Sequence, residues 1–167
     1  MSVVILPITE AHTQSFHACL DSVAQERKFL GQTKAAPIER IAEFVRNNVA
    51  NGHPQYVAVQ GSQVVGWCDA VPHWAPALKH RANLGMGILK EHRRRGMGEQ
   101  LLRVVIQRAS ALGLKRVDLE VRADNFAAIG LYEKCGFQID GRKKMGLCYD
   151  GEFYDVLEMG LLIGHSA

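Results

Sequence analysis

The hydrophobic pattern of this 167-residue chain changes repeatedly between the two-residue period of strands and the longer period of helices. The changes give the order βααβββαβαββ, which predicts a mixed α/β sheet. We expect strands at residues 3–8, 55–60, 63–71, 82–89, 117–122, 137–149 and 152–163. We expect helices from Thr9 to about Lys28, from Pro37 to Asn51, after Gly98 as far as Leu112, and from Asp124 or Asn125 to Gly136. No linker, repeat or low-complexity tract interrupts this order, so residues 1–167 are expected to form a single domain.

Composition excludes several classes of protein. With 47% hydrophobic and 22% charged residues the chain is an ordinary soluble globular protein, and a net charge of +3 is too small for a dedicated nucleic-acid binder. No apolar run approaches the length of a membrane span, and residues 1–10 lack the features of a signal peptide. The four cysteines have no C-x-x-C spacing, which predicts buried thiols in a reducing compartment. We therefore expect a cytoplasmic protein, with no membrane partner and no metal.

Residues 92–98 read His-Arg-Arg-Arg-Gly-Met-Gly and lead directly into a helical pattern. Glycine lets the backbone turn tightly and approach a ligand, and the first N–H groups of a helix face anions. Backbone amides of residues 94–99 are therefore expected to bind a phosphate group, with arginine side chains adding charge-assisted hydrogen bonds. The arginines alone would also suit a solvated surface loop.

A second segment sharpens this interpretation. The loop Arg93-x-x-Gly96-x-Gly98 is followed by Asn125-x-x-Ala-x-x-Leu-Tyr132-x-x-x-Gly136-Phe137. Together the two segments resemble the GNAT superfamily of N-acetyltransferases. Residues 120–137 are most similar to the ribosomal-protein alanine acetyltransferases and to relatives of unassigned substrate. The resemblance implies a mostly antiparallel sheet flanked by helices, with splayed central strands, and acetyl-coenzyme A as the acetyl donor.

The resemblance also implies where the cofactor binds. Backbone groups of the strand at 82–89 pair with pantetheine as an added strand would, and the loop holds the pyrophosphate. Gly85 and Gly87 suit a bulge or a close approach of the backbone, although they would also simply relieve crowding. The residues expected to contact acetyl-coenzyme A are Met86, Gly87, Ile88, Arg93, Arg94, Arg95, Gly96, Met97, Gly98, Glu99, Asn125 and Tyr132.

The implied reaction is direct attack of a primary amine on the thioester, through a tetrahedral intermediate. An alkylamine is mostly protonated at neutral pH, so a base must take a proton, directly or through water. Glu120 matches the family's base position, and Asp118 on the same face is a weaker candidate for a water relay. Tyr132 has the family's position for the acid that protonates the leaving thiolate. Glu120 would otherwise pair with Arg122 or Lys115, and Tyr132 would otherwise be a packed aromatic.

The acceptor amine is expected between the first two helices, the loop after residue 71 and the last hairpin. Phe29, Trp74 and Tyr154 are the candidate contacts, because aromatic rings suit an apolar or amino-acid-like substrate. The acceptor is a small-molecule amine or a peptide N-terminus, and the family's habits favour a homodimer. The alternatives are a protein N-terminal or ribosomal-protein acetyltransferase, a non-catalytic acyl-coenzyme A sensor and, with least support, a nucleic-acid binder.

Overall fold

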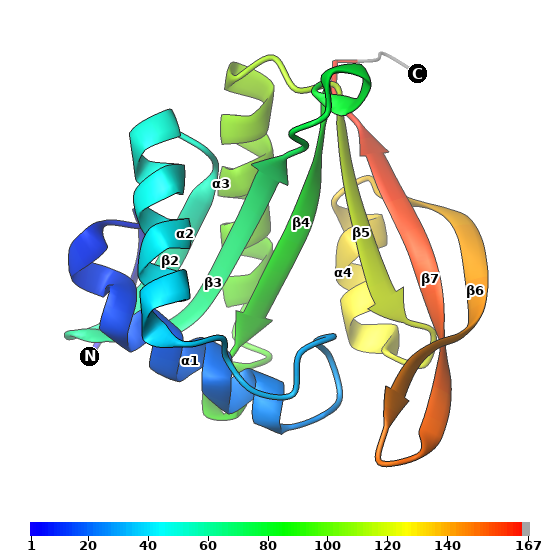
Figure 1. Cartoon of the computed structure of the whole chain (residues 1–167), viewed down its shortest axis with the longest axis horizontal. Coiled ribbons are helices and arrows are strands. Elements are labelled where there is room, and N and C mark those ends of the chain that lie inside the picture. Colours follow the sequence, from blue (N-terminus) through cyan, green and yellow to red (C-terminus); the bar gives the residue numbers. More distant parts are fainter. Residues whose placement is uncertain (165–167) are drawn as a thin grey trace.

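The alternating apolar residues of the strands build one seven-stranded sheet in the computed structural model, which describes residues 1–164 (Figure 1). Its strand order is β1-β2-β3-β4-β5-β7-β6. The strands are β1 (Val3–Pro7), β2 (Gln55–Gln60), β3 (Gln63–Pro72), β4 (Arg81–Ile88), β5 (Arg116–Arg122), β6 (Gln138–Tyr149) and β7 (Glu152–Leu162). Neighbouring strands are antiparallel except β4 and β5, which are parallel. The expected mixed, mostly antiparallel sheet is confirmed.

Two helices cover each face of the sheet. The helices are α1 (Thr13–Gln25), α2 (Ile38–Asn51), α3 (Met97–Ala111) and α4 (Phe126–Lys134). In Figure 1, α1 and α2 lie in front of β2, β3 and β4, while α3 and α4 lie behind the sheet. The front of β5, β7 and β6 carries no helix among the described residues. This half of the front face is therefore open to a ligand.

The first helix is shorter than its pattern predicts. A 3₁₀ turn, Glu10–His12, precedes α1, and α1 ends at Gln25 rather than near Lys28. Arg27 has a φ of 54°, and a residue in this left-handed conformation does not continue an α-helix. Residues 26–37 therefore form the connection between α1 and α2.

Apolar side chains between the sheet and the helices form one core. In β5, Val117, Leu119 and Val121 are buried against the side of α3 and α4, as the alternation predicts. Two cysteines, Cys19 and Cys68, are buried in this core, but Cys148 is exposed, so the expectation that all four thiols are buried is wrong for that residue. No helix in residues 1–164 is long and apolar enough to cross a membrane.

The two central strands part soon after they meet. Pairing between β4 and β5 is limited to Arg81–Asn83 opposite Arg116–Asp118. Beyond this point β4 continues to Ile88 and β5 to Arg122 without pairing to each other. The splayed central strands are therefore confirmed, and they leave a gap in the middle of the sheet.

Candidate active site

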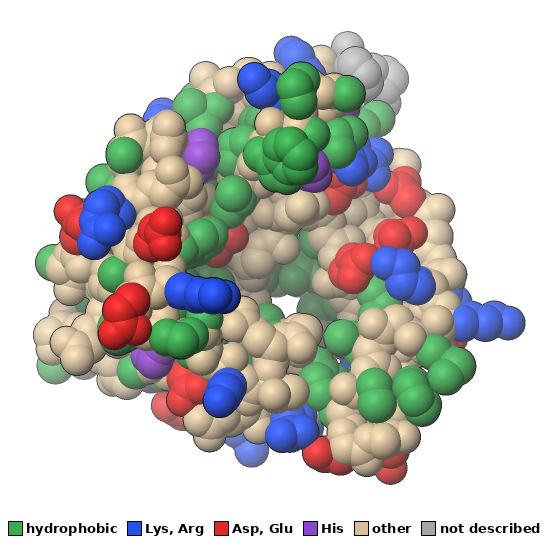
Figure 2. Space-filling view, in the orientation of Figure 1, with side chains coloured by type: hydrophobic (Ala, Val, Ile, Leu, Met, Phe, Trp, Pro, Cys, Tyr) green, Lys and Arg blue, Asp and Glu red, His purple; other side chains and the backbone are tan. Residues whose placement is uncertain are grey.

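The gap between β4 and β5 exposes backbone groups that a ligand can use. The Leu89 N–H donates to the Val65 carbonyl of β3, at 2.9 Å. Because backbone groups in a strand point alternately to either side, those of Ile88 and Met86 point into the gap, and those of Gly87 point to β3. Figure 2 shows an opening through the molecule where the two strands part. Met86 and Ile88 therefore suit pairing with an extended ligand.

The glycines of β4 mark no bulge. The register between β3 and β4 is continuous from Gly66 opposite Ile88 to Pro72 opposite Ala82. A Cβ at Gly87 would overlap the ring of Trp67, and a Cβ at Gly85 would lie 3.4 Å from Asp69 Oδ1. Of the two features expected at these glycines, a bulge or a close backbone approach, the bulge is absent. Because these two glycines have no side chain, the Trp67 ring and the Asp69 carboxyl of β3 lie over the backbone of β4.

The loop after β4 ends in an exposed helix N-terminus. Arg94 and Gly96 have φ values of 61° and 78°, which turn the chain sharply into α3. The first helical hydrogen bond of α3 runs from Gln100 N–H to the Gly96 carbonyl, so the amides of residues 97–99 have no helical partner. A Cβ at Gly98 would lie 3.1 Å from Leu131, which explains a glycine where α3 passes α4. These free amides form the cradle for an anion that the sequence predicts.

The three arginines of this loop have different surroundings. Arg93 makes a two-pronged ion pair with Glu26, at 2.5 and 2.9 Å, and donates to the Ile88 carbonyl at 2.8 Å. Its guanidinium also lies 4.8 Å from the centre of the Phe29 ring. Arg94 and Arg95 are exposed and form no ion pair within residues 1–164. The side chain of Arg93 is thus engaged with α1 and its connection to α2, while the other two are available for a phosphate.

Two residues of the second motif lie in and before α4. Asn125 caps the helix, since its Oδ1 accepts a hydrogen bond from the Ala128 N–H at 3.2 Å. Tyr132 is buried beside Phe137, and this burial raises the pKa of its phenol well above its ordinary value. Cys68 on β3 raises that pKa further. Tyr132 therefore stays protonated at neutral pH, as a general acid must.

Glu120 lies on the opposite, open face of β5. Its side chain is 56% exposed and forms a 2.6 Å ion pair with Lys143 of the edge strand β6. Lys143 also lies 3.3 Å from Glu158, which is directly opposite Glu120 on β7. The partner is thus neither Arg122 nor Lys115, the two expected from the sequence.

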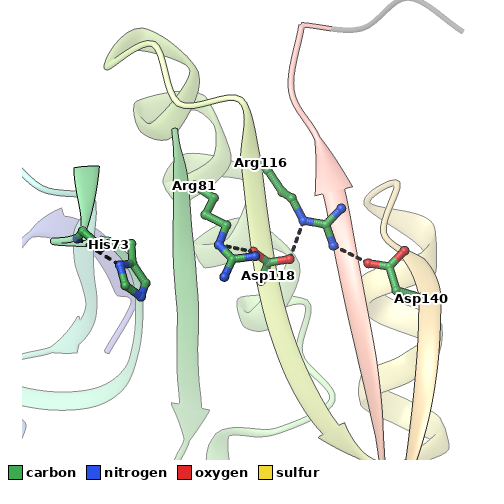
Figure 3. Close-up of polar contacts among 6 residues, drawn as sticks. His73, Arg81, Arg116, Asp118 and Asp140 are labelled. Atoms are coloured by element: carbon green, nitrogen blue, oxygen red, sulfur yellow. Dashed lines mark hydrogen bonds and ion pairs between the residues drawn. The ribbon is translucent and has the colours of Figure 1, made fainter. Parts of the chain in front are cut away.

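Asp118 is held between two guanidinium groups (Figure 3). Arg116 donates to it at 2.5 Å and Arg81 lies 3.8 Å away, while Arg116 also pairs with Asp140 of β6. These contacts join β4, β5 and β6 where the central strands still pair. The Asp118 carboxylate is therefore already engaged by two arginine side chains.

Asp69 on β3 is a feature that our interpretation of the sequence missed. It is only 8% exposed, and burial raises the pKa of its carboxyl to about 7. It forms no ion pair within residues 1–164. The available signal was a carboxylate in the middle of an apolar strand, Val64-Val-Gly-Trp-Cys-Asp-Ala-Val71.

A cavity of about 360 Å³ lies between the end of α1 and the β6–β7 hairpin. Its lining residues are Glu26, Arg27, Lys28, Arg122, Tyr149, Asp150, Glu152 and Tyr154. The Arg27–Asp150 ion pair and the hydrogen bond from the Tyr149 hydroxyl to the Leu30 carbonyl link its two walls. The cavity thus combines both signs of charge with two phenol rings.

The candidate acceptor residues do not all come together. Tyr154 lines the cavity, and Phe29 lies just after the end of α1, half-buried against the Arg93 guanidinium. Trp74 is 84% exposed and follows β3, at the end of the sheet where β4 begins. Tyr154 instead lies where β5 ends, since Val156 is opposite Arg122. Trp74 is therefore at the opposite end of the sheet from Tyr154.

Comparisons with known proteins agree with this geometry. The model of the acetyltransferase (GNAT) family matches residues 16–137. The chain is 32% identical to the L-amino acid N-acetyltransferase AaaT of Escherichia coli over 65% of this chain and 67% of that protein. It is 32% identical to an L-methionine sulfoximine/L-methionine sulfone acetyltransferase of Pseudomonas aeruginosa, over 73% and 72% of the two chains. Matches to two mouse N-acetyltransferases of family 8 span only 39% of their length.

A solved structure shares the fold over nearly the whole chain. It is an acetyltransferase of the GNAT family from Streptococcus pneumoniae, 26% identical, with a TM-score of 0.90. The superposition covers 97% of this chain and all of the other. The match therefore includes the edge strands and the last hairpin, which the family model leaves out.

Proposed function

The chain belongs to the GNAT acetyltransferase family and is an acetyl-coenzyme A-dependent N-acetyltransferase, and we propose that its acceptor is the α-amino group of an amino acid or a close analogue. The charge of the cavity beside the β6–β7 hairpin carries this proposal. Lys28 and Glu152 form no ion pair within residues 1–164, so Lys28 suits a carboxylate and Glu152 suits an ammonium group. The names of the two bacterial relatives, which act on amino acids or amino-acid analogues, support the same class.

The residues around the gap fit the donor. The free amides of residues 97–99, with Arg94 and Arg95 nearby, suit its pyrophosphate. The backbone groups of Met86 and the N–H of Ile88 suit the amides of pantetheine, while the Ile88 carbonyl already accepts from Arg93. Bound in this way, acetyl-coenzyme A supplies a thioester for attack by the amine. Holding the amine beside that thioester supplies much of the rate, because the family reaction forms no covalent bond to the protein.

Tyr132 is our candidate for the acid. The amine attacks the thioester carbonyl from the open face, and Tyr132 belongs to α4, which lies on the other face of the sheet. Its phenol gives a proton to the sulfur as the carbon–sulfur bond breaks. The base implied by the resemblance is Glu120, whose ion pair with Lys143 must open or be shared for that role.

A screen that detects the released thiol tests the acceptor class. It compares L-amino acids, their α-carboxamides, polyamines, aminoglycosides and short peptides. We expect the highest kcat/KM for an L-amino acid and a loss of at least about tenfold for its carboxamide, which lacks the carboxylate. A peptide or polyamine that reacts best would contradict the proposal and favour a protein N-terminal or another amine acetyltransferase. Binding of acetyl-coenzyme A without thiol release would instead favour a sensor.

The expectations of a homodimer, a cytoplasmic location, a single domain and no nucleic-acid partner stay predictions. Light scattering after size-exclusion chromatography measures the first. We expect twice the chain mass of 18.5 kDa. A monomer at micromolar concentration would contradict this expectation.

A further inference from the structure

One buried carboxyl group lies on the acceptor side of the gap, and the family resemblance gives it no role. Asp69 is opposite Gln55 on β2 and opposite Gly85 on β4. Its neighbour two residues along β3, Trp67, packs edge-on against Phe16 of α1, with 5.7 Å between the ring centres. Side chains two residues apart in a strand share a face, so Asp69 is on the side of α1 and α2. Tyr132, on α4, is on the other side.

The glycines of β4 give this carboxyl access to the gap. With no side chain at Gly85, Asp69 Oδ1 reaches to 3.4 Å from the position that a Cβ would occupy. Trp67 crosses Gly87 in the same way. The next β4 residue on this face, Asn83, is exposed and uncharged. On this face, the rim of the gap is thus built by side chains of β3 rather than by those of β4.

We propose that Asp69, lying across Gly85 at the rim of the gap, is the catalytic residue that takes the proton from the acceptor amine. The inference rests on the acetyl transfer proposed above. It replaces Glu120 as the base, because Glu120 is exposed and already paired with Lys143. Asp118 is excluded as well, because its carboxylate is already paired with Arg81 and Arg116.

The proposed acetyl transfer uses Asp69, Tyr132 and solvent for its proton transfers. The ammonium form of the acceptor first loses one proton to solvent; the neutral amine nitrogen then forms a bond to the thioester carbon, and the second proton that it loses goes to the Asp69 carboxylate. The carbon–sulfur bond breaks, and the sulfur takes the phenol proton of Tyr132. The proton on Asp69 then leaves to solvent, and Tyr132 regains a proton from solvent. The products are the N-acetyl compound and the free thiol.

The surroundings of Asp69 suit a base that works near neutral pH. Burial is the only cause that raises the pKa of its carboxyl to about 7, and no charged group contributes. The side chains nearest it on the neighbouring strands, Gln55 on β2 and Asn83 on β4, are neutral. Gln55 is itself buried, and its Nε2 has no hydrogen-bond partner within residues 1–164. A carboxyl that ionises near pH 7 accepts protons more effectively than an ordinary aspartate.

Substitution by the isosteric amide tests the proposal. Asp69→Asn should lower kcat at least about 100-fold on the best amine, with the Kd for acetyl-coenzyme A within about twofold of wild type. Asp140→Asn, a surface control on β6, should leave kcat within about twofold. Asp69→Ser is made alongside, so that the test does not depend on one variant folding. Thermal melts and calorimetric titration with coenzyme A verify that the variants fold and bind.

The pH profile distinguishes a base from a structural residue. The acceptor amine itself titrates above pH 7. In the wild type, the logarithm of kcat/KM should therefore rise with a slope near two below pH 7 and near one above it. In Asp69→Asn the slope should stay near one throughout.

Either of two results would overturn the proposal. One is an Asp69→Asn enzyme with a wild-type rate or an unchanged profile. The other is a slope below pH 7 that falls from about two to about one in Glu120→Gln but not in Asp69→Asn, which would assign the base to Glu120. A wild-type enzyme that acetylates no amino acid but some other amine would refute only the proposed acceptor class, because Asp69 is then tested on that amine.

Discussion

Single residues at this site are explained by their surroundings more than by their type. Three carboxyl groups, Asp69 on β3 and Asp118 and Glu120 on β5, lie on the same face of the sheet. One is buried without a charged partner, one is held by two arginines, and one is exposed beside a lysine. The three carboxyl groups therefore differ in the cations that an amine would have to displace.

Asp69 should make stability depend on pH. Its pKa is raised in the folded state, so between about pH 4 and pH 7 the folded chain binds more protons than the unfolded chain, and stability falls as the pH rises. Asp69→Asn removes this loss. We measure the free energy of unfolding of variant and wild type by urea denaturation. The variant value minus the wild-type value should be about 2–3 kcal/mol larger at pH 8 than at pH 5. An equal difference at both pH values would show that the carboxyl ionises normally.

Tyr132→Phe tests the acid without changing the shape of the core. Loss of the phenolic hydroxyl should lower kcat about 10- to 100-fold, because the thiolate would leave unprotonated. The Kd for acetyl-coenzyme A, measured by calorimetry, should stay within about twofold. Tyr56→Phe on β2 is the control for loss of a hydroxyl elsewhere. An unaltered kcat would show that Tyr132 is not the acid.

At the scale of elements, the gap depends on where β4 and β5 are tied together and where they are not. The Arg81–Asp118 ion pair links the strands at the end where they pair, and the Arg93–Glu26 ion pair anchors the loop that follows β4. Between these ties, the backbone of β4 is free on the side of β5. The opening is therefore a fixed feature of the sheet.

Gly87 should be indispensable to the packing of β4. A methyl group there overlaps the Trp67 ring, and overpacking of a core costs about 1–3 kcal/mol. We expect Gly87→Ala to lower the free energy of unfolding by this amount in a urea titration. Gly31→Ala, where the added Cβ meets nothing within 4 Å, should change it by less than about 0.5 kcal/mol. Equal effects would mean that the Trp67 ring moves aside freely.

The N-terminus of α3 should bind phosphate partly through exposed arginines. Arg94→Ala, alone and with Arg95→Ala, should raise the KM for acetyl-coenzyme A about 5- to 20-fold and weaken its dependence on salt, with kcat nearly unchanged. Arg40→Ala on α2 is a control for loss of an exposed arginine. If the KM stays at its wild-type value, the backbone amides alone bind the pyrophosphate.

At the scale of the whole molecule, contacts distant in sequence join the donor side to the acceptor side. Arg93 precedes α3, while its partner Glu26 follows α1 and lines the acceptor cavity. The same guanidinium contacts Phe29 and the end of β4. The Arg93 side chain thus links the residues after α1, at the acceptor cavity, to the end of β4.

Arg93→Ala should therefore affect stability and the acceptor more than the donor. Removing the guanidinium leaves Glu26 partly buried and unpaired, which should cost about 1–2 kcal/mol in a urea titration. The KM for the amine should rise more than the KM for acetyl-coenzyme A, the reverse of Arg94→Ala. A larger increase in the KM for acetyl-coenzyme A than in the KM for the amine would indicate that Arg93 binds the pyrophosphate.

Most of the fold could be predicted from the sequence, because local signals specify it. The alternation in β5, the cap at Asn125 and the left-handed glycines at Gly96 and Gly136 depend only on nearby residues. The two motifs of the donor site are likewise contiguous segments. Apolar periodicity and cap chemistry act over a few residues, so a single sequence carries them.

The tertiary structure decided which side chains share a site. The chain folds so that Lys143 meets Glu120, Glu26 meets Arg93, and Trp74 lies far from Tyr154. Asp69 becomes unusual only because neighbouring strands and helices remove most water from around it. Burial and ion pairing arise from elements distant in sequence, and their effect on charge therefore depends on the assembled sheet.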